Sequence, residues 1–546
     1  MHMKRGKFIF LSLYLMIGSL NTLTAQTSGE GSQFLLNSLF VIAALVFFAI
    51  VVQVSDNLMA IEAKRIGADK DGHNFGLIPR FQELFGDKLP SYLKNERVIS
   101  SNKGFDIALE GQASNEILDA SILRVAVNPT NFKGISPIPK VVVEVGDTVK
   151  AGDPIFYDKS QPDLIFSSPV SGEIVEIKRG EKRAIHEIII LADKTQEFKS
   201  FEKPDLKNIS REDLVKTLAS SGLMTFFLQR PFNALPDLNV IPRDIFVSTF
   251  DSAPLAPDLA YALKGQEVAF QAGIDTLTKL TSGKVYLALD GRSETDTSSI
   301  FTGVTGAEKY YFRGKHPIGN VGVQIHHIKP VSPSDKVWTI NAQDVAILGN
   351  FALEGKVKQS RMVAITGADL NKTGYVKVPV GASVSDLLQS ENISSAYRII
   401  SGDVLSGTQV TLDGFVGFYD DQVTVVEEGN NYELFGWLLP LDMRPSVSKT
   451  FPSNLLGGVS SAANTNNRGE KRAFVVTGEY DNLLPMDILP QQLFKAIVVN
   501  DIEKMENLGI HELVEEDVAL CEFGCTSKQP LQAILRKGLD VVKAEG

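Results

Sequence analysis

The stretch Val141-Val-Val-Glu-Val-Gly-Asp-Thr-Val-Lys-Ala-Gly-Asp-Pro-Ile-Phe-Tyr157 alternates apolar side chains with Gly-Asp pairs. The stretch Ile165-Phe-Ser-Ser-Pro-Val-Ser-Gly-Glu-Ile-Val-Glu-Ile177 and the run 184–191 have the same character. Such alternation, bounded by glycine and proline, is typical of β-strands joined by tight turns. The sequence therefore predicts a small β-domain within residues 101–200.

This spacing of valines, glycines and aspartates resembles the flattened β-barrel of biotinyl and lipoyl domains. Those domains carry a modified lysine at a hairpin tip, and Lys159 lies in the corresponding gap between the two stretches. The residues beside Lys159 differ from the usual Asp-Lys-Ala or Met-Lys-Met context, and the gap to Pro169 is longer than usual. We expect a barrel-sandwich scaffold without the modification; a lipoylated or biotinylated Lys159 is the alternative.

Helices and strands alternate in the next segment, residues 201–350. Ser210 has the character of an N-cap and precedes an acidic first turn, while 267–280 has a helical pattern. The apolar runs 245–250 and 284–289 read as strands. The alternation predicts an α/β domain.

Beyond this domain the pattern changes twice. Residues 351–435 return to β, with strand runs on both sides of Ser401-Gly-Asp-Val-Leu-Ser-Gly407. Residues 436–546 are mostly helical; the helical runs are 487–499, 501–508, 515–520 and 530–542. The chain is thus predicted to be a multidomain α/β and β protein that ends in a helical domain.

The amino-terminal part reads as a membrane anchor. The segment 33–55 carries no charge and is long enough, at ~1.5 Å per residue, for a transmembrane helix across the ~30 Å of bilayer hydrocarbon. Residues 1–25 form either a secretory signal or a first hydrophobic segment. Residues 56–100 are polar and predict a connector.

Basic residues flank the two apolar runs, at Lys4–Lys7 on one side and Lys64–Lys70 on the other. By the positive-inside rule both flanks face the cytoplasm, which places the soluble body on the cytoplasmic side of a bacterial inner membrane. The rival topology, a signal anchor that exports the body, would expose two unpartnered cysteines to an oxidising compartment.

The composition of the 546-residue chain excludes several classes of protein. Charged residues make up 22% and hydrophobic residues 44%, which are globular values. The net charge of −11 argues against nucleic-acid binding. Two cysteines exclude a disulfide framework.

Motifs that would define a cofactor or metal site are missing. We interpret His326-His327 as part of a strand, where neighbouring side chains point to opposite faces and cannot share one metal ion. Cys521 and Cys525 provide only two of the four ligands that an iron–sulfur cluster or structural zinc needs. The glycine-rich stretch 316–322 fits a turn between strands at least as well as a phosphate cradle. Residue chemistry alone defines no active site.

Several strings, in one order, resemble the A subunit of the Na⁺-translocating NADH:quinone reductase family. The strings are Lys103-Gly-Phe-Asp-Ile-Ala-Leu-Glu-Gly111, Thr225-Phe-Phe-Leu-Gln-Arg-Pro-Phe232, Ala253-Pro-Leu-Ala256, Arg398-Ile-Ile-Ser-Gly-Asp-Val-Leu-Ser-Gly407, Glu433-Leu-Phe-Gly-Trp437 and Leu484-Pro-Met-Asp-Ile-Leu-Pro490. The resemblance extends from about Lys103 to Gly546. Residues 1–100 depart from the family's usual pattern, so the anchor is an addition.

The resemblance implies a cytoplasmic, peripheral subunit of a six-subunit membrane complex that oxidises NADH, reduces quinone and exports Na⁺. It implies that the other subunits, membrane lipid at 33–55 and quinone are the partners. The complex would contain FMN, FAD, riboflavin and iron–sulfur centres. The implied fold is Rossmann-like at 201–350, related to the flavin subunit of complex I, and β-grasp (SLBB-like) at 351–435.

Those relatives carry a glycine-rich flavin loop and four cluster cysteines. Here Ser220-Ser-Gly-Leu-Met-Thr-Phe-Phe227 stands at the loop, and one glycine cannot give the close backbone approach that a phosphate needs. Cys521 and Cys525 resemble a remnant of the cluster domain. The expectation is that this chain binds no redox cofactor or metal of its own.

The family is associated with quinone binding, and two stretches match the implicated motifs. They are Phe227-Leu-Gln-Arg-Pro-Phe-Asn-Ala234 and Asn131-Phe-Lys-Gly134. A quinone head needs aromatic walls and donors for its carbonyls. The candidate quinone-binding residues are Phe227, Arg230, Phe232, Phe132 and Lys133.

Three functions stay open at this point. The chain is a scaffold subunit with a quinone-binding role, an assembly and anchoring module without a ligand, or a self-standing flavin-containing NADH dehydrogenase. The missing glycine loop argues against the third. In the alternative reading of the first motif, Phe227 and Phe232 are core packing and Arg230 is a surface ion-pair partner.

Overall fold

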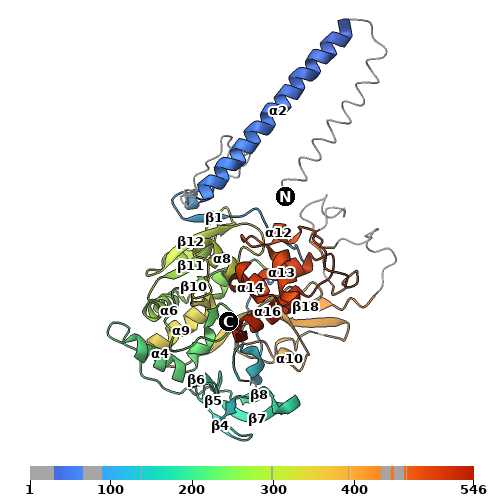
Figure 1. Cartoon of the computed structure of the whole chain (residues 1–546). Helices are drawn as coiled ribbons and strands as arrows, with labels where there is room; N and C mark the ends of the chain where they lie inside the picture. Colours follow the sequence, from blue (N-terminus) through green and yellow to red (C-terminus); the bar gives the residue numbers. More distant parts are fainter. Residues whose placement is uncertain are drawn as a thin grey trace. The chain divides into compact units, whose positions relative to one another are not determined.

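The computed structural model describes residues 30–65, 89–136, 138–296, 299–391, 393–431, 444–447, 460–462 and 464–545 (Figure 1). The chain divides into two compact units, Met1–Ser91 and Tyr92–Gly546, which we describe separately. The predicted first hydrophobic segment at residues 1–25 lies outside the described residues.

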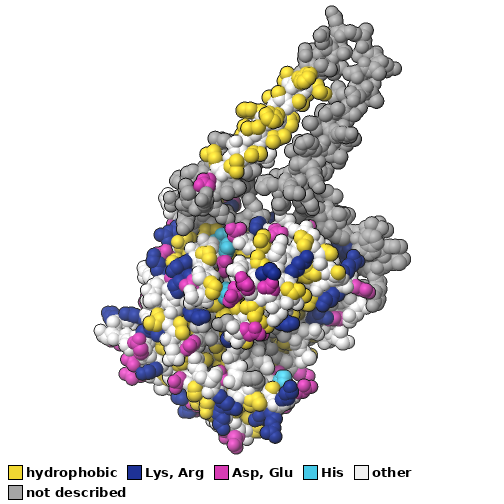
Figure 2. All heavy atoms as spheres, in the orientation of Figure 1, with side chains coloured by type: hydrophobic (Ala, Val, Ile, Leu, Met, Phe, Trp, Pro, Cys, Tyr) yellow, Lys and Arg dark blue, Asp and Glu magenta, His cyan; other side chains and the backbone are white. Residues whose placement is uncertain are grey.

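The first unit contains one long helix, α2 (Glu30–Arg65). Its part Ser38–Asp56 has a mean hydropathy of 2.6, and at 1.5 Å per residue these 19 residues extend for about 29 Å. Figure 2 shows a nearly continuous hydrophobic surface along the drawn part of this helix. The predicted apolar helix is therefore confirmed, although it continues past the expected end at residue 55, because Leu58, Met59 and Ala63 favour helix.

The second unit begins with a barrel made of two small antiparallel sheets, in the strand orders β2-β8-β7-β4 and β3-β5-β6. Its strands are β2 (Arg124–Val127), β3 (Lys140–Val141), β4 (Thr148–Val149), β5 (Pro154–Asp158), β6 (Gln161–Ser167), β7 (Gly172–Arg179) and β8 (Ile185–Ala192). Phe156 and Phe166 stack in its interior at 4.3 Å between ring centroids. Lys159 lies exposed in the tight turn between β5 and β6.

The largest sheet has six strands in the order β1-β12-β11-β10-β13-β9, and only β9 is antiparallel to its neighbour. The strands are β1 (Val98–Ser100), β9 (Leu228–Arg230), β10 (Ile245–Ser248), β11 (Val285–Asp290), β12 (Glu308–Arg313) and β13 (Val337–Asn341). The chain moves outward from β10 to β11 and β12 and then returns to the other side of β10 with β13. This reversal is the topological switch point, where open α/β sheets bind ligands.

Helices cover this sheet. They are α4 (Arg211–Ser220), α5 (Leu259–Ala262), α6 (Glu267–Leu280), α7 (Ser299–Thr302), α8 (Val321–Ile328) and α9 (Ala342–Glu354). Ser210 caps α4 as predicted, because its side chain accepts a hydrogen bond from the Asp213 backbone N–H. The edge strand β1 falls within the predicted connector 56–100, because Val98 and Ile99 pair with the otherwise open edge of β12.

A five-stranded sheet follows, in the order β15-β14-β18-β16-β17. Its elements are β14 (Ser360–Thr366), β15 (Gly374–Pro379), β16 (Tyr397–Ser401), β17 (Thr408–Val410), β18 (Gln422–Glu427) and the short helix α10 (Val384–Leu387). It encloses a core of its own that includes Val363, Val376 and Val423.

The carboxyl-terminal part is helical, as predicted. Its helices are α12 (Tyr480–Leu483), α13 (Pro490–Val498), α14 (Ile502–Asn507), α15 (Glu515–Phe523) and α16 (Leu531–Glu545). Cys521 and Cys525 are both buried as free thiols, and the Tyr480 hydroxyl donates to Cys525 Sγ at 2.8 Å. Among the described residues, no group of three or more His, Cys, Asp or Glu side chains could hold a metal ion.

One local prediction was wrong. The stretch 316–322 does not connect two strands; it leads from β12 into α8, which contains both His326 and His327. The two imidazoles have separate partners, Glu512 at 2.7 Å and the Pro485 carbonyl at 2.8 Å. A short apolar run such as 321–328 does not distinguish strand from helix, which explains the error.

Candidate functional site

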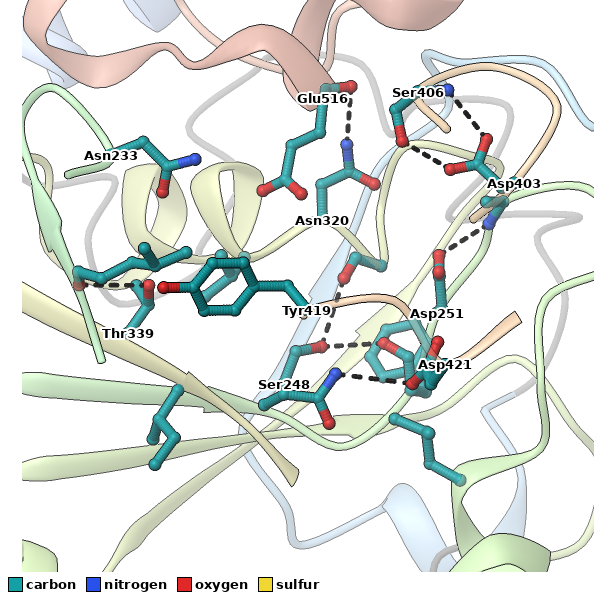
Figure 3. A pocket seen from close by; sticks show the side chains of 18 of the residues that line it. Asn233, Ser248, Asp251, Asn320, Thr339, Asp403, Ser406, Tyr419, Asp421 and Glu516 are labelled. Carbon is teal, nitrogen blue, oxygen red and sulfur yellow. Dashed lines mark hydrogen bonds between the residues drawn. The ribbon is translucent and has the colours of Figure 1, made fainter. Parts of the chain in front are cut away.

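A cavity of about 220 Å³ lies at the switch point, beyond the carboxyl ends of β10 and β13 (Figure 3). Ser248 and Asn341, the last residues of these two strands, both line it. The five-stranded sheet and its loops contribute residues within 403–421, and α15 contributes Glu516 and Ala519. Three domains thus meet at this cavity.

Carboxyl groups dominate the polar lining. Figure 3 shows Asp251, Asp403 and Asp421 on one side of the cavity and Glu516 on another. Burial raises the pKa of Asp421 to about 7, although Arg361 opposes the shift. Burial likewise raises the pKa of Asp251, and the nearby charge of Asp403 adds to the shift. For both carboxyl groups, burial outweighs the nearby guanidinium groups, Arg361 for Asp421 and Arg292 for Asp251.

The fifth carboxyl group at the cavity, Asp344, is neutralised by Arg361. The guanidinium donates from Nη2 to both carboxylate oxygens, at 2.7 and 2.8 Å, and from Nε at 3.0 Å. Both side chains are almost inaccessible to solvent, at 1% and 0% exposure. This ion pair joins α9 to β14 and thereby joins the α/β domain to the five-stranded sheet.

Arg230 is the only predicted quinone-binding residue that lines the cavity. It is 2% exposed, and its guanidinium pairs with Glu516 at 3.0 Å and Asp517 at 3.4 Å. The alternative reading of Arg230 as a surface ion-pair partner was therefore wrong about the surface position, although the ion pairs are present. The cause is β9, which carries Arg230 to the edge of the sheet, where the first turn of α15 offers two carboxylates.

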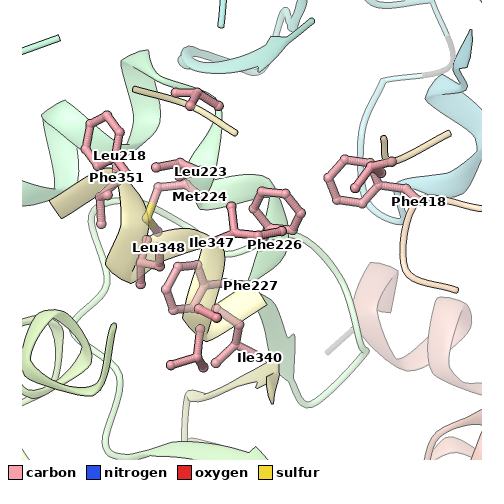
Figure 4. Close-up of a cluster of buried hydrophobic side chains, with 14 of the residues drawn as sticks. Leu218, Leu223, Met224, Phe226, Phe227, Ile340, Ile347, Leu348, Phe351 and Phe418 are labelled. Atoms are coloured by element: carbon pink, nitrogen blue, oxygen red, sulfur yellow. The ribbon is translucent and has the colours of Figure 1, made fainter. Parts of the chain in front are cut away.

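Phe227 and Phe132 are core residues. Phe227 is fully buried beside Trp338, at 5.5 Å between ring centroids, in the cluster that Figure 4 shows. Phe132 is 4% exposed inside the barrel and packs edge-on against Phe166 at 4.6 Å. The contacts of Phe227 match its core-packing reading, and Phe132 is a core residue as well.

Lys133 and Phe232 lie at a second place, outside the cavity. The Leu235 backbone N–H donates to the Lys133 carbonyl at 3.1 Å, so the two predicted motifs lie side by side. The Lys133 ammonium pairs with Glu515 at 2.6 Å. Phe232 is half-buried and packs edge-on against His511 at 6.2 Å.

The acidic partners of both basic candidates were missed in the sequence. Lys133 and Arg230 pair with three consecutive residues, Glu515, Glu516 and Asp517, at the start of α15. The available signal was this acidic run at a helix start, where carboxylates favour the helix dipole. We call Lys133, Arg230 and residues 515–517 the acidic seam.

The turn at Gly222 precedes the predicted motif and packs tightly. Gly222 has a φ of 84°, and a Cβ atom there would lie 2.2 Å from Ser167 Oγ of the barrel. Ser167 Oγ donates to the Ser221 carbonyl at 2.9 Å. The short 3₁₀ helix Leu223–Phe226 follows and is fully buried. Protein atoms therefore occupy the space around this turn.

Family models match three parts of the chain. Residues 99–193 match the "NqrA N-terminal barrel-sandwich hybrid domain", residues 209–357 the "NqrA second alpha/beta domain" and residues 362–411 the "NQRA C-terminal domain". These matches confirm the barrel-sandwich domain and the α/β domain that the sequence predicted.

Known proteins match nearly the whole second unit. The A subunit of the Na(+)-translocating NADH-quinone reductase of Vibrio atlanticus is 36% identical over 82% of this chain and 100% of its own length. The same subunit of Neisseria meningitidis serogroup B is 35% identical with the same two coverages. A solved NAD⁺-reducing [NiFe]-hydrogenase aligns over 43% of this chain with 12% identity and a TM-score of 0.29, which is too low to support an argument. By its match to full-length relatives, the chain belongs to the NqrA family, the A subunits of the Na⁺-translocating NADH-quinone reductase.

Proposed function

We propose that this chain is the cytoplasmic-side scaffold subunit of a membrane complex that oxidises NADH, reduces quinone and exports Na⁺. The observation that carries the proposal is the match to relatives of that name over their full length. The apolar helix α2 supports attachment to the inner membrane. Co-purification of five further subunits with the tagged full-length chain, together with Na⁺-dependent NADH:quinone reductase activity, tests it. A chain that purifies alone from its native membrane would contradict it.

The chain itself holds no flavin in this proposal. The support is local: the Gly222 turn packs against Ser167, and the buried rings of Phe226 and Phe227 follow it. A flavin phosphate needs free backbone N–H groups and space at such a turn. The purified full-length chain should lack absorbance near 450 nm. Flavin or iron in a one-to-one ratio, after purification without oxygen, would contradict the proposal.

Its orientation is part of the same proposal. Basic residues on both flanks of the amino-terminal apolar segments favour a cytoplasmic body. Protease added to intact spheroplasts should leave residues 100–546 uncut, and cleavage of the body there would reverse the topology.

A quinone-binding role is the finer proposal, and the acidic seam is where it is best supported. The two motifs meet there, Phe232 provides a half-buried ring, and the Arg230 Nε is a buried donor without a partner among the described residues. Titration of the detergent-solubilised chain with short-chain ubiquinone and menaquinone tests it. Saturable binding with either quinone supports the role.

The alternative is a pure assembly module without a ligand. A specific observation favours it: the terminal nitrogens of Arg230 are engaged by carboxylates, and Phe227 and Phe132 are packed in cores. Absence of saturable quinone binding would select this alternative.

A further inference from the structure

Apart from Arg230 and Glu516, the residues that line the switch-point cavity have no role in the quinone proposal. The carboxyl groups of the cavity provide more hydrogen-bond acceptors than the protein fills. The side chain of Asp421 meets the Asn341 amide at a long 3.5 Å, and Asp251 accepts from the Ala253 backbone at 2.8 Å. A ligand that fits this wall must bring hydrogen-bond donors. A phosphate or another anion is disfavoured wherever these carboxyl groups are ionised, because like charges repel at such short range.

Two buried nitrogens in the same lining lack a partner. His316 and Arg230 both line the cavity, at 3% and 2% exposure. His316 Nε2 and Arg230 Nε have no hydrogen-bond partner in the described part of the chain. A metal ion or an ammonium group would leave the Arg230 Nε–H unsatisfied, which is costly in a buried site. No group of three or more His, Cys, Asp or Glu side chains within the described ranges could hold a metal ion.

Ser252 Oγ accepts from the Gly319 backbone N–H at 2.8 Å and lies 3.1 Å from His316 Nδ1, a contact that fits either tautomer of the neutral imidazole. In the tautomer in which Ser252 donates to Nδ1, the imidazole proton lies on Nε2, and Nε2 is then a donor. Burial lowers the pKa of His316 to about 4, so the ring is neutral at pH 7.

Hydroxyl groups on a ligand would satisfy both the carboxyl acceptors and the unpartnered nitrogens of the lining, because each hydroxyl group donates and accepts hydrogen bonds. Part of the remaining lining is apolar and aromatic: Phe226, Phe250, Leu259, Ile340 and Leu405. Such a surface accommodates a flat ring. The volume of about 220 Å³ is below the 300–1,000 Å³ that is usual for larger ligands, so a dinucleotide does not fit.

We propose that the switch-point cavity binds an uncharged ring that carries hydroxyl groups, of the nucleoside class, and that it rejects the phosphorylated forms. The ring lies against the apolar wall, the hydroxyls donate to Asp421 and Asp251, and His316 donates to the ligand. The switch point of an α/β sheet is the general place for nucleotide-type ligands, and here the acidic lining changes the class that fits.

The test is calorimetric titration of the full-length chain in detergent with adenosine, uridine and their 5′-monophosphates. At least one nucleoside should bind saturably, with a Kd at least tenfold lower than that of its monophosphate. Absence of nucleoside binding at millimolar concentration, or a monophosphate that binds equally well, would overturn the proposal.

Two variants and one control locate the ligand. Asp421→Asn should weaken nucleoside binding about tenfold. It should also reduce the ratio between the Kd of the monophosphate and the Kd of the nucleoside. Asp420→Asn is the matched control, because the adjacent Asp420 accepts from Ser401 Oγ at 2.6 Å and does not line the cavity. It should bind as the unaltered chain does.

If Asp421→Asn fails to fold, Ser406→Phe replaces it. Ser406 is exposed at the rim, so a ring there blocks the cavity without altering a core. Nucleoside binding that persists unchanged in a folded Ser406→Phe chain would place the ligand elsewhere and refute the assignment. Arg230, which both proposals involve, is left unaltered in all variants, so quinone binding can be measured on the same proteins.

Discussion

Two buried arginines beside the same cavity differ in how completely they are paired. Arg361 meets Asp344 through three hydrogen bonds of 2.7 to 3.0 Å. Arg230 meets two carboxylates through one contact each, at 3.0 and 3.4 Å, while its Nε and Asp517 Oδ1 lack partners among the described residues. The first pair is a closed link between domains. The Arg230 pair leaves one donor and one acceptor free to bind a ligand at a site where three domains meet. It is therefore the better candidate for ligand binding.

The largest expected effect is at the closed pair. Arg361→Ala leaves the Asp344 carboxylate buried without its counter-charge, so we expect a loss of about 3–5 kcal/mol in the free energy of unfolding. Urea unfolding of the fragment 92–546, which forms its own compact unit, measures it.

The double variant Arg361→Met with Asp344→Leu is the control for that prediction. Replacing a whole buried ion pair by apolar side chains of similar volume is often neutral. The double variant should therefore recover most of the stability. A single variant that unfolds like the unaltered fragment would show that the pair contributes nothing.

The second effect is at the incomplete pair. Arg230→Ala should lower the free energy of unfolding by about 1.5–3 kcal/mol, the range for hydrogen bonds to charged groups. We expect less than for Arg361, because Glu516 reaches solvent at 41% exposure and can be rehydrated.

Quinone affinity separates structure from function at Arg230. If the Nε donates to a quinone carbonyl, Arg230→Ala should also weaken quinone binding by about 1.5–3 kcal/mol, which is roughly tenfold or more. Arg230→Lys keeps the charge but loses the Nε, so it should restore stability better than quinone affinity. Equal quinone affinity in all three folded proteins would leave Arg230 as a structural residue only.

Much of this comparison could not be predicted from the sequence. The predicted helix at 267–280 agrees with α6, and the barrel was correctly predicted, because periodicity and turn residues act over short distances. The partners of Arg230 and Arg361 depend on how domains pack. Asp517 lies 287 residues from Arg230, and no local pattern relates the two.

The cavity shows the same limit. Its acidic lining combines Asp251 from the α/β domain with Asp421 and Glu516 from later domains, and each one looks like an ordinary surface carboxylate in the sequence. The absence of a glycine loop could be read from the sequence, because a phosphate-binding loop needs a contiguous motif. The family match at residues 362–411 supports the SLBB-like domain predicted at 351–435, whereas its finer β-grasp assignment stays a prediction.

A third effect is the pH dependence of the incomplete pair. Burial is the main cause that raises the pKa of Asp517 to about 7 from 3.8, and Arg230 opposes it. Between these values the folded state holds a proton that the unfolded state has released. Stability should therefore fall as the pH rises from about 4 to about 7, by at most ~1.4 kcal/mol per pH unit from this group.

Asp517→Asn removes that titration, so the stability of the variant should depend less on pH across this window. Urea unfolding at pH 5.5 and 7.5 measures the difference. Asp540→Asn, at a carboxylate that is 66% exposed, is the control and should keep the original slope. A slope that is the same in both variants would mean that Asp517 is ionised throughout.

The smallest effect is expected at Lys133, the exposed member of the acidic seam. Its ammonium pairs with Glu515 at 2.6 Å, but its side chain is 42% exposed, and Arg536 also approaches Glu515, at 3.6 Å. An exposed ion pair contributes about 0.2–1 kcal/mol, and the remaining cation softens its loss. Lys133→Ala should thus change the free energy of unfolding by less than about 1 kcal/mol.

Lys133→Ala is therefore the cleanest probe of the quinone proposal, because an altered quinone affinity could not be attributed to a damaged fold. A more than tenfold loss of quinone affinity with unchanged unfolding would place the quinone at the seam, whereas unchanged affinity here and in Arg230→Ala would reduce the seam to a link between the barrel, the α/β domain and α15.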